Sequence, residues 1–466
     1  MSLPASTSNT PADNLQNNTW IAFARSEKPA ELSGEFHSLY SRLGFASRLD
    51  FHDAMNKAML APIQEVIEEL SVESGSPSVS ARELLAAFLI RRNDYYGVSA
   101  KETRMIHEAL LPYLPGNSPF HGYAIFHQSN RLVQEGKAME ALELLDNFEK
   151  AIPAQSDEVI SIWQKTLVVT ARCMALTSLG LFREATDQLE AALREARGLS
   201  FTLTSIIEYH LAILFRDSGQ QSQAISIWQH QARVKQLKEN QCWENLVVNY
   251  LNACRCSIDL KDAKSAQFAL EEAERYLPHI DSKYPRLRGY LYLRQGELAT
   301  LKEDYLTGEE RLTAAIDYFE KVLPPCPEGW LESRIALGHY ALLQDNIPLA
   351  WAIIKKLIME AEELGHMALR SQALLMQTWF FVTDQPPGQD TFEEVHDQVR
   401  MIHNPALLFH AFSNLLTYAI DHLGESEAQN ILDQMESLRD RLTDESYDQL
   451  LDKHLPSHLR EPELEN

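Results

Sequence analysis

Residues 166–193, TLVVTARCMALTSLGLFREATDQLEAAL, contain two amphipathic segments that meet at a single glycine. Apolar residues recur at three- and four-residue spacing on both sides of Gly180, which predicts two helices, and glycine permits a tight turn between them. Ala185 and Ala192 are small enough for a neighbouring helix to approach the second segment closely. Because a pair of this length cannot bury its own apolar faces, the stretch predicts further pairs stacked on both sides.

The same arrangement recurs along the chain at a nearly constant interval. A small residue opens the second helix of each expected pair, at intervals of 44, 39, 42, 42 and 42 residues: Ala141, Ala185, Ala224, Ala266, Gly308 and Ala350. A large side chain follows four residues later in every pair, at Leu145, Leu189, Trp228, Leu270, Leu312 and Ile354. A fixed period of this kind indicates one helix–turn–helix unit per repeat.

These positions resemble the tetratricopeptide repeat, in which small residues admit a neighbouring helix and a large side chain fills the gap between helices. The unit is longer than the ~34 residues of the standard repeat and is similar to the extended units of bacterial regulators and sensors. The resemblance implies an all-α fold, a right-handed superhelix of about seven helical pairs. Glycines stand at the turns of the first three units, at 136, 180 and 219. Lys261, Glu303 and Asp345 replace them later, so these turns are expected to close without a left-handed residue.

Composition divides the chain into four expected parts. Residues 1–18 are rich in Ser, Thr, Asn and Pro and predict a disordered tail. Residues 19–119 have helical periodicity without a repeat, which predicts an N-terminal helical region. Residues 120–441 hold the repeats, interrupted by the loop DQPPGQD at 384–390, and residues 442–466 predict a C-terminal capping helix with an acidic tail.

The charge balance argues against nucleic acid and membrane surfaces as partners. The net charge is −24, from 42 Lys and Arg against 66 Asp and Glu, and such a field repels phosphate groups and anionic lipids. Residues 91–110, RRNDYYGVSAKETRMIHEAL, loosely resemble a helix-turn-helix, but acidic side chains balance the basic ones, so no basic recognition face emerges. Two ordinary helices explain this stretch equally well.

No catalytic or metal-binding motif emerges from the sequence. The five cysteines form no CxxC pair, and the sixteen histidines lack the spacing of metal ligands. The chain has no HExxH, no phosphate-binding glycine loop and no nucleophile elbow. The chaperone-binding clamp of some tetratricopeptide proteins is missing too, since Phe126 stands where that clamp needs a cation. The odd number of cysteines fits a reducing compartment, so we expect a cytoplasmic protein. The missing motifs lead us to expect that it is not an enzyme and needs neither cofactor nor metal.

The first helices of stacked pairs line the concave side of a superhelix, so residues on their inner face are candidates for partner binding. The candidate groove consists of Tyr123, Phe126, Asn130, Tyr209, Arg216, Asn252, Arg255, Arg294 and His339. Aromatic, amide and cationic groups together suit a peptide segment. The three arginines are expected to be exposed and to favour a partner segment that carries carboxylates.

Two functions are compatible with these features. The first is a non-enzymatic scaffold or regulator that holds a segment of a partner protein in the concave groove. The second is a regulator that senses a peptide or another small ligand, in which binding changes the pitch of the superhelix. The second possibility follows from the resemblance to bacterial sensors, and the residues alone do not separate the two.

Overall fold

The computed structural model describes residues 111, 119–151, 158–197, 201–239, 242–280, 284–322, 326–383, 386–439, 447–448 and 451. Within these ranges all regular secondary structure is helical. The predicted tail 1–18, nearly all of 19–119 with its helix-turn-helix-like stretch 91–110, and most of 442–466 lie outside the described residues.

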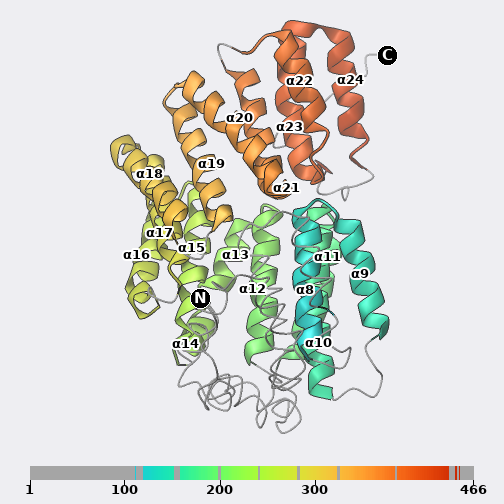
Figure 1. The fold of residues 1–466 in the computed structure, drawn as a ribbon, viewed down its shortest axis with the longest axis vertical. Helices are drawn as coiled ribbons and strands as arrows, with labels where there is room; N and C mark the ends of the chain where they lie inside the picture. Colours follow the sequence, from blue (N-terminus) through green and yellow to red (C-terminus); the bar gives the residue numbers. More distant parts are fainter. Residues whose placement is uncertain are drawn as a thin grey trace, which may run out of the picture.

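The described helices follow one another as eight pairs, and a short turn joins the two helices of each pair except the seventh, where residues 379–388 intervene (Figure 1). The pairs are α8 (Pro119–Gln134) with α9 (Ala138–Ala151), α10 (Glu158–Ser178) with α11 (Phe182–Ala196), α12 (Phe201–Asp217) with α13 (Gln221–Trp228), α15 (Trp243–Asp259) with α16 (Ala263–Tyr276), α17 (Arg286–Leu301) with α18 (Tyr305–Lys321), α19 (Pro327–Leu343) with α20 (Ile347–Glu363), α21 (Met367–Thr378) with α22 (Gln389–Val399), and α23 (Pro405–Tyr418) with α24 (Glu425–Glu436). Shorter segments are α14 (Gln231–Glu239), η3 (Leu277–His279), η4 (Trp379–Val382) and the π-helical η5 (Ala419–Leu423). Helices contact their neighbours in sequence, as in the predicted tetratricopeptide-like architecture.

The repeat positions lie at the contacts between helices, which confirms the predicted register. The five alanines of the small-residue series, Ala141, Ala185, Ala224, Ala266 and Ala350, are completely buried, and the six large side chains that follow them are buried as well. The sixth small residue is Gly308, where a Cβ atom would lie 2.7 Å from Oγ1 of Thr300. Any larger side chain at these positions would collide with the facing helix, because protein interiors have few voids.

The turns inside the first six pairs use the left-handed region, including those without glycine. Gly136, Gly180 and Gly219 have φ between 78° and 84°. Lys261, Glu303 and Asp345 take the same role with φ values of 58°, 61° and 54°. The expectation that the later turns close without a left-handed residue is therefore wrong. The turn geometry is the same in all six units, so these three residues accept the steric cost that glycine avoids.

The second helix of the third unit is broken. Helix α13 ends at the fully buried Trp228, and α14 begins at the exposed Gln231. The break places Arg233 against α12, where its guanidinium group pairs with Glu208 and donates a hydrogen bond to the carbonyl oxygen of Ser205. An internal ion pair thus replaces the apolar contact that a continuous helix would supply.

The two ends of the described superhelix meet. In Figure 1 the last helices, α21–α24, lie directly above the first ones, α8–α11. Nη2 of Arg131 on α8 donates a hydrogen bond to the carbonyl oxygen of Leu364 at the end of α20, 3.3 Å away. At the turn after α8, a Cβ atom on Gly136 would lie 2.5 Å from the ring of His403, in the segment before α23. These contacts close the helical pairs into a ring around a shared interior.

Candidate functional site

The first helices of the fourth, fifth and sixth units face one interior surface. Nη1 of Arg255 on α15 and Oε1 of Glu332 on α19 lie 3.7 Å apart, although α17 separates these helices in the chain. Nη2 of Arg294 on α17 lies 3.3 Å from the other oxygen of the same carboxylate. A side chain can reach past the neighbouring helix only on the concave side, so these residues mark the inner face.

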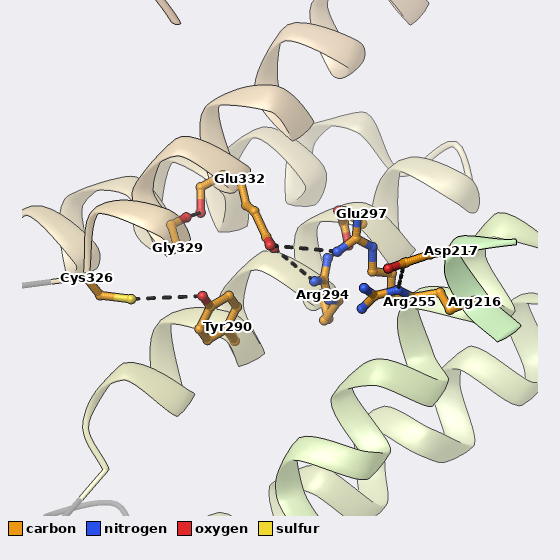
Figure 2. A network of polar contacts seen from close by, with 10 residues as sticks. Arg216, Asp217, Arg255, Tyr290, Arg294, Glu297, Cys326, Gly329 and Glu332 are labelled. Atoms are coloured by element: carbon orange, nitrogen blue, oxygen red, sulfur yellow. Dashed lines mark hydrogen bonds and ion pairs between the residues drawn. The ribbon is translucent and has the colours of Figure 1, made fainter. Parts of the chain in front are cut away.

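Arg294 is held inside this network (Figure 2). Its side chain is 5% exposed, and it pairs with Glu297 on its own helix as well as with Glu332. The sequence-based expectation that Arg294 is an exposed cation is wrong. Two carboxylates neutralise its charge, which is the condition under which an arginine is tolerated in a buried place.

Arg216 and Arg255 are less enclosed than Arg294. Their side chains are 20% and 28% exposed. Among the described residues, Arg216 donates one hydrogen bond, from Nε to Oδ1 of Asp217 (2.7 Å). The 3.7 Å ion pair of Arg255 with Glu332 is too long for a hydrogen bond. Most of the donor capacity of these two guanidinium groups therefore stays available.

Two glutamates one helical turn apart on α19 are affected in opposite directions. Glu328 is exposed on the inner surface, yet the surrounding helices restrict its hydration. This desolvation, with the nearby charge of Glu332, raises the pKa of Glu328 to about 7, although three arginines oppose the shift. Desolvation would also raise the pKa of Glu332, but Arg255, Arg294 and Arg216 outweigh it and lower the pKa.

Aromatic groups lie where the first and third units approach each other. The ring centroids of Phe126 on α8 and His210 on α12 are 6.0 Å apart, and those of Tyr209 and His210 are 5.6 Å apart. Burial lowers the pKa of His210 to about 4, so this imidazole is neutral near pH 7. The interior thus combines an aromatic part with a charged part.

The remaining predicted groove residues are more scattered. Asn130 on α8 and Asn252 on α15 are half-buried. The exposed His339 on α19 has its ring centroid 5.5 Å from that of Trp379; desolvation lowers its pKa, partly opposed by Glu297. The backbone of Tyr123 belongs to α8, but its side chain lies outside the described atoms. Of the nine predicted groove residues, Arg255 and Arg294 are joined by their ion pairs with Glu332, and the charge of Arg216 acts on the same carboxylate.

Sequence reasoning missed Glu328 and Glu332 on this surface, although the repeat contains a signal for such charges. Glu244, Arg286 and Glu328 stand 42 residues apart at one repeat position, and Nη2 of Arg286 lies 3.7 Å from Oε1 of Glu244. Arg255 and Glu297 share another position at the same interval. Charges that alternate in sign at equivalent positions of stacked helices predict ion pairs between units.

Other kinds of site find no support in the described part of the chain. No group of three or more His, Cys, Asp and Glu residues in these ranges lies close enough to hold a metal ion. None of the five cysteines, all of which lie in the described ranges, forms a disulfide bond. None of the described helices has the length and apolar character that a membrane span requires.

Comparisons with known proteins give a structural likeness only. No protein family matches the chain, and no curated protein matches it. Among 39 matching solved chains are NprR in complex with its cognate peptide NprX, with 13% identity over 77% of this chain and 99% of that one, and a TM-score of 0.48. Another is the apo form of the quorum sensor NprR from B. thuringiensis, with 14% identity over 80% and 99%, and a TM-score of 0.43. Similarity at this level does not indicate what this chain binds.

Proposed function

We propose that this chain is a non-enzymatic cytoplasmic binding protein whose superhelix holds a segment of a partner protein, or a free peptide, in its interior. The observation that supports this function best is the convergence of Arg255, Arg294 and Glu332 from three first helices on one concave surface. A surface built from several units is long enough to contact an extended segment at several points. Hydrogen-bonding groups are available along it for a peptide backbone.

The chemistry of the interior suits a peptide better than a flat protein surface. The half-buried Phe126 and Tyr209 offer apolar rings at one part, whereas Arg216 and Arg255 offer donors at another. A peptide side chain that binds at each part would fix both the position and the direction of the segment.

Selection followed by mapping tests this function. The immobilised full chain is incubated with random octapeptides, the retained peptides are sequenced by mass spectrometry, and one of them is resynthesised. Hydrogen–deuterium exchange with this peptide should show protection on the first helices α8, α12, α15, α17 and α19. Protection confined to the second helices would place binding on the convex side, and the absence of retained peptides would contradict the function.

The contact between the ends of the superhelix favours a sensing role as a second candidate. Arg131 reaches the carbonyl oxygen of Leu364, a residue 233 positions later, so the ring depends on contacts between its first and later units. His366, just beyond this contact, interacts electrostatically with Arg131 and with Glu332. A ligand in the interior would act on the same groups, and its binding could thereby be coupled to the opening of the ring.

Distance measurements between spin labels test this second candidate. Met139 on α9 and Met359 on α20 are 66% and 57% exposed, so Met139→Cys and Met359→Cys can carry labels without disturbing the core. A Cys242→Ser background removes the one cysteine that is not buried. A selected peptide should shift the distance distribution between the labels if binding changes the pitch. If the distance distribution between the labels did not change at saturating peptide, the sensing role would be excluded and the scaffold function would remain.

A further inference from the structure

Arg216 and Arg255 differ from their neighbour Arg294 in how many of their donors are engaged. Arg294 is buried between Glu297 and Glu332 and donates hydrogen bonds to both carboxylates. Arg216 donates only from Nε to Asp217 among the described residues, and Arg255 has only a long ion pair with Glu332. The planar guanidinium group carries five N–H donors. The guanidinium groups of Arg216 and Arg255 are therefore partly enclosed on the inner surface, and most of their N–H donors are not engaged by described residues.

The partial enclosure of these groups makes an incoming acceptor more effective. Their side chains are 20% and 28% exposed, so they have lost part of their hydration without gaining a full set of protein acceptors. Hydrogen bonds between a guanidinium group and a carboxylate are strong, and the fork of N–H groups matches the two oxygens. Both charges favour the ionised forms of the same two carboxyl groups: Arg216 and Arg255 oppose the rise in the pKa of Glu328 and contribute to the lowered pKa of Glu332.

Further charged groups act on Glu328, on the same inner surface. Glu328 on α19 faces Glu332 on the same helix, Arg286 on α17, Arg216 on α12 and Arg255 on α15. Neither Arg216 nor Arg255 forms an ion pair with Glu328, so their nitrogen atoms lie more than 4.0 Å from its carboxylate oxygens. Arg216 and Arg255 therefore do not use their remaining donors on Glu328 and keep them for an additional acceptor.

We propose that the interior recognises a peptide segment through one of its carboxylates, which binds between Arg216 and Arg255. This inference rests on the proposed binding function and specifies its ligand class. Glu332 acts as an internal competitor, since it attracts Arg255 in the free protein and has to share this arginine with the incoming carboxylate. Arg294 keeps Glu332 in place and does not contact the ligand.

Two matched peptide pools test the assignment with the full chain. Both consist of acetylated and amidated octapeptides with seven random positions; the eighth position is Glu in one pool and Gln in the other. We expect the protein to retain the Glu pool about tenfold better, the effect of one charge-assisted contact. The double variant Arg216→Gln/Arg255→Gln should retain both pools equally, at the level of the Gln pool. Glu332→Gln should increase the preference for Glu, because it removes the internal competitor.

The control variant is Arg334→Gln. Arg334 also lies on α19, is 17% exposed and pairs with Glu360, but it stacks on Trp330 outside the network. This variant should keep the preference for the Glu pool. Equal retention of both pools by the unmodified chain would overturn the inference and leave the binding function intact, whereas retention of neither pool would overturn both. A preference that survives in the double variant, or disappears in Arg334→Gln, would show that the carboxylate binds elsewhere.

Discussion

Arg255 on α15 and Glu332 on α19 form an ion pair across the inner face of the superhelix, with 3.7 Å between Nη1 and Oε1. Their units are not adjacent in the stack, because the α17–α18 pair lies between them. The pair therefore depends on the rotation from one unit to the next, which turns the inner ends of three first helices toward a common space. No spacing along the chain would connect these two residues.

The buried position of Arg294 leads to a prediction about stability. Arg294→Glu would place a third carboxylate against Glu297 and Glu332, so we expect a loss of about 3 kcal/mol or more in the free energy of unfolding. Arg183→Glu on the exposed face of α11 is the control and should change it by about 0.5 kcal/mol at most. Urea denaturation followed by circular dichroism measures both. If Arg294→Glu lowered the free energy of unfolding by as little as Arg183→Glu, the side chain at position 294 would be in contact with solvent and not buried.

The left-handed turns predict that glycine stabilises the later units. Lys261, Glu303 and Asp345 have exposed side chains and positive φ. Replacing each by glycine removes the steric cost, and we expect a gain of about 0.5 to 1 kcal/mol per position. Glu310→Gly, an exposed position inside α18, should instead cost about 1 kcal/mol. Denaturation midpoints that fall in all four variants would contradict the turn geometry.

The packing of the small-residue series predicts that its members cannot be enlarged. Ala266 is completely buried at the start of α16, so Ala266→Leu should cost about 1 to 3 kcal/mol through overpacking. Lys264→Leu places the same side chain at an exposed position of that helix and should have little effect. Equal unfolding free energies of the two variants would contradict the register of the fourth unit.

The raised pKa of Glu328 predicts a pH-dependent contribution to stability. In the folded protein the pKa of this carboxyl group is about 7, whereas in the unfolded chain the group has its ordinary pKa of 4.5. The folded state therefore binds more protons between these values, so the stabilising contribution is present below pH 4.5 and is lost as the pH rises to about 7. Glu328→Gln should match the parent in melting temperature at pH 4 and exceed it at pH 8. A difference of the same size at both pH values would rule out titration as the cause.

The local pattern of the sequence is sufficient for the helical pairs and their register. A small residue at Ala185 and a large one at Leu189 specify which face of α11 is buried, because residues four apart share a face of a helix. Gly180, which has a positive φ, likewise specifies the turn that precedes α11. These features depend on neighbours within one unit, so the 42-residue repeat predicts them without any tertiary information.

Tertiary structure decided which of the predicted groove residues are available to a ligand. The repeat places Arg216, Arg255 and Arg294 on first helices, but only the superhelical rotation brings Glu332 to Arg294 and leaves Arg216 with open donors. The contact of Arg131 with Leu364 arises in the same way, from small rotations that add up over several units. A repeat encodes each rotation through side-chain packing between units, and a spacing pattern does not contain that information.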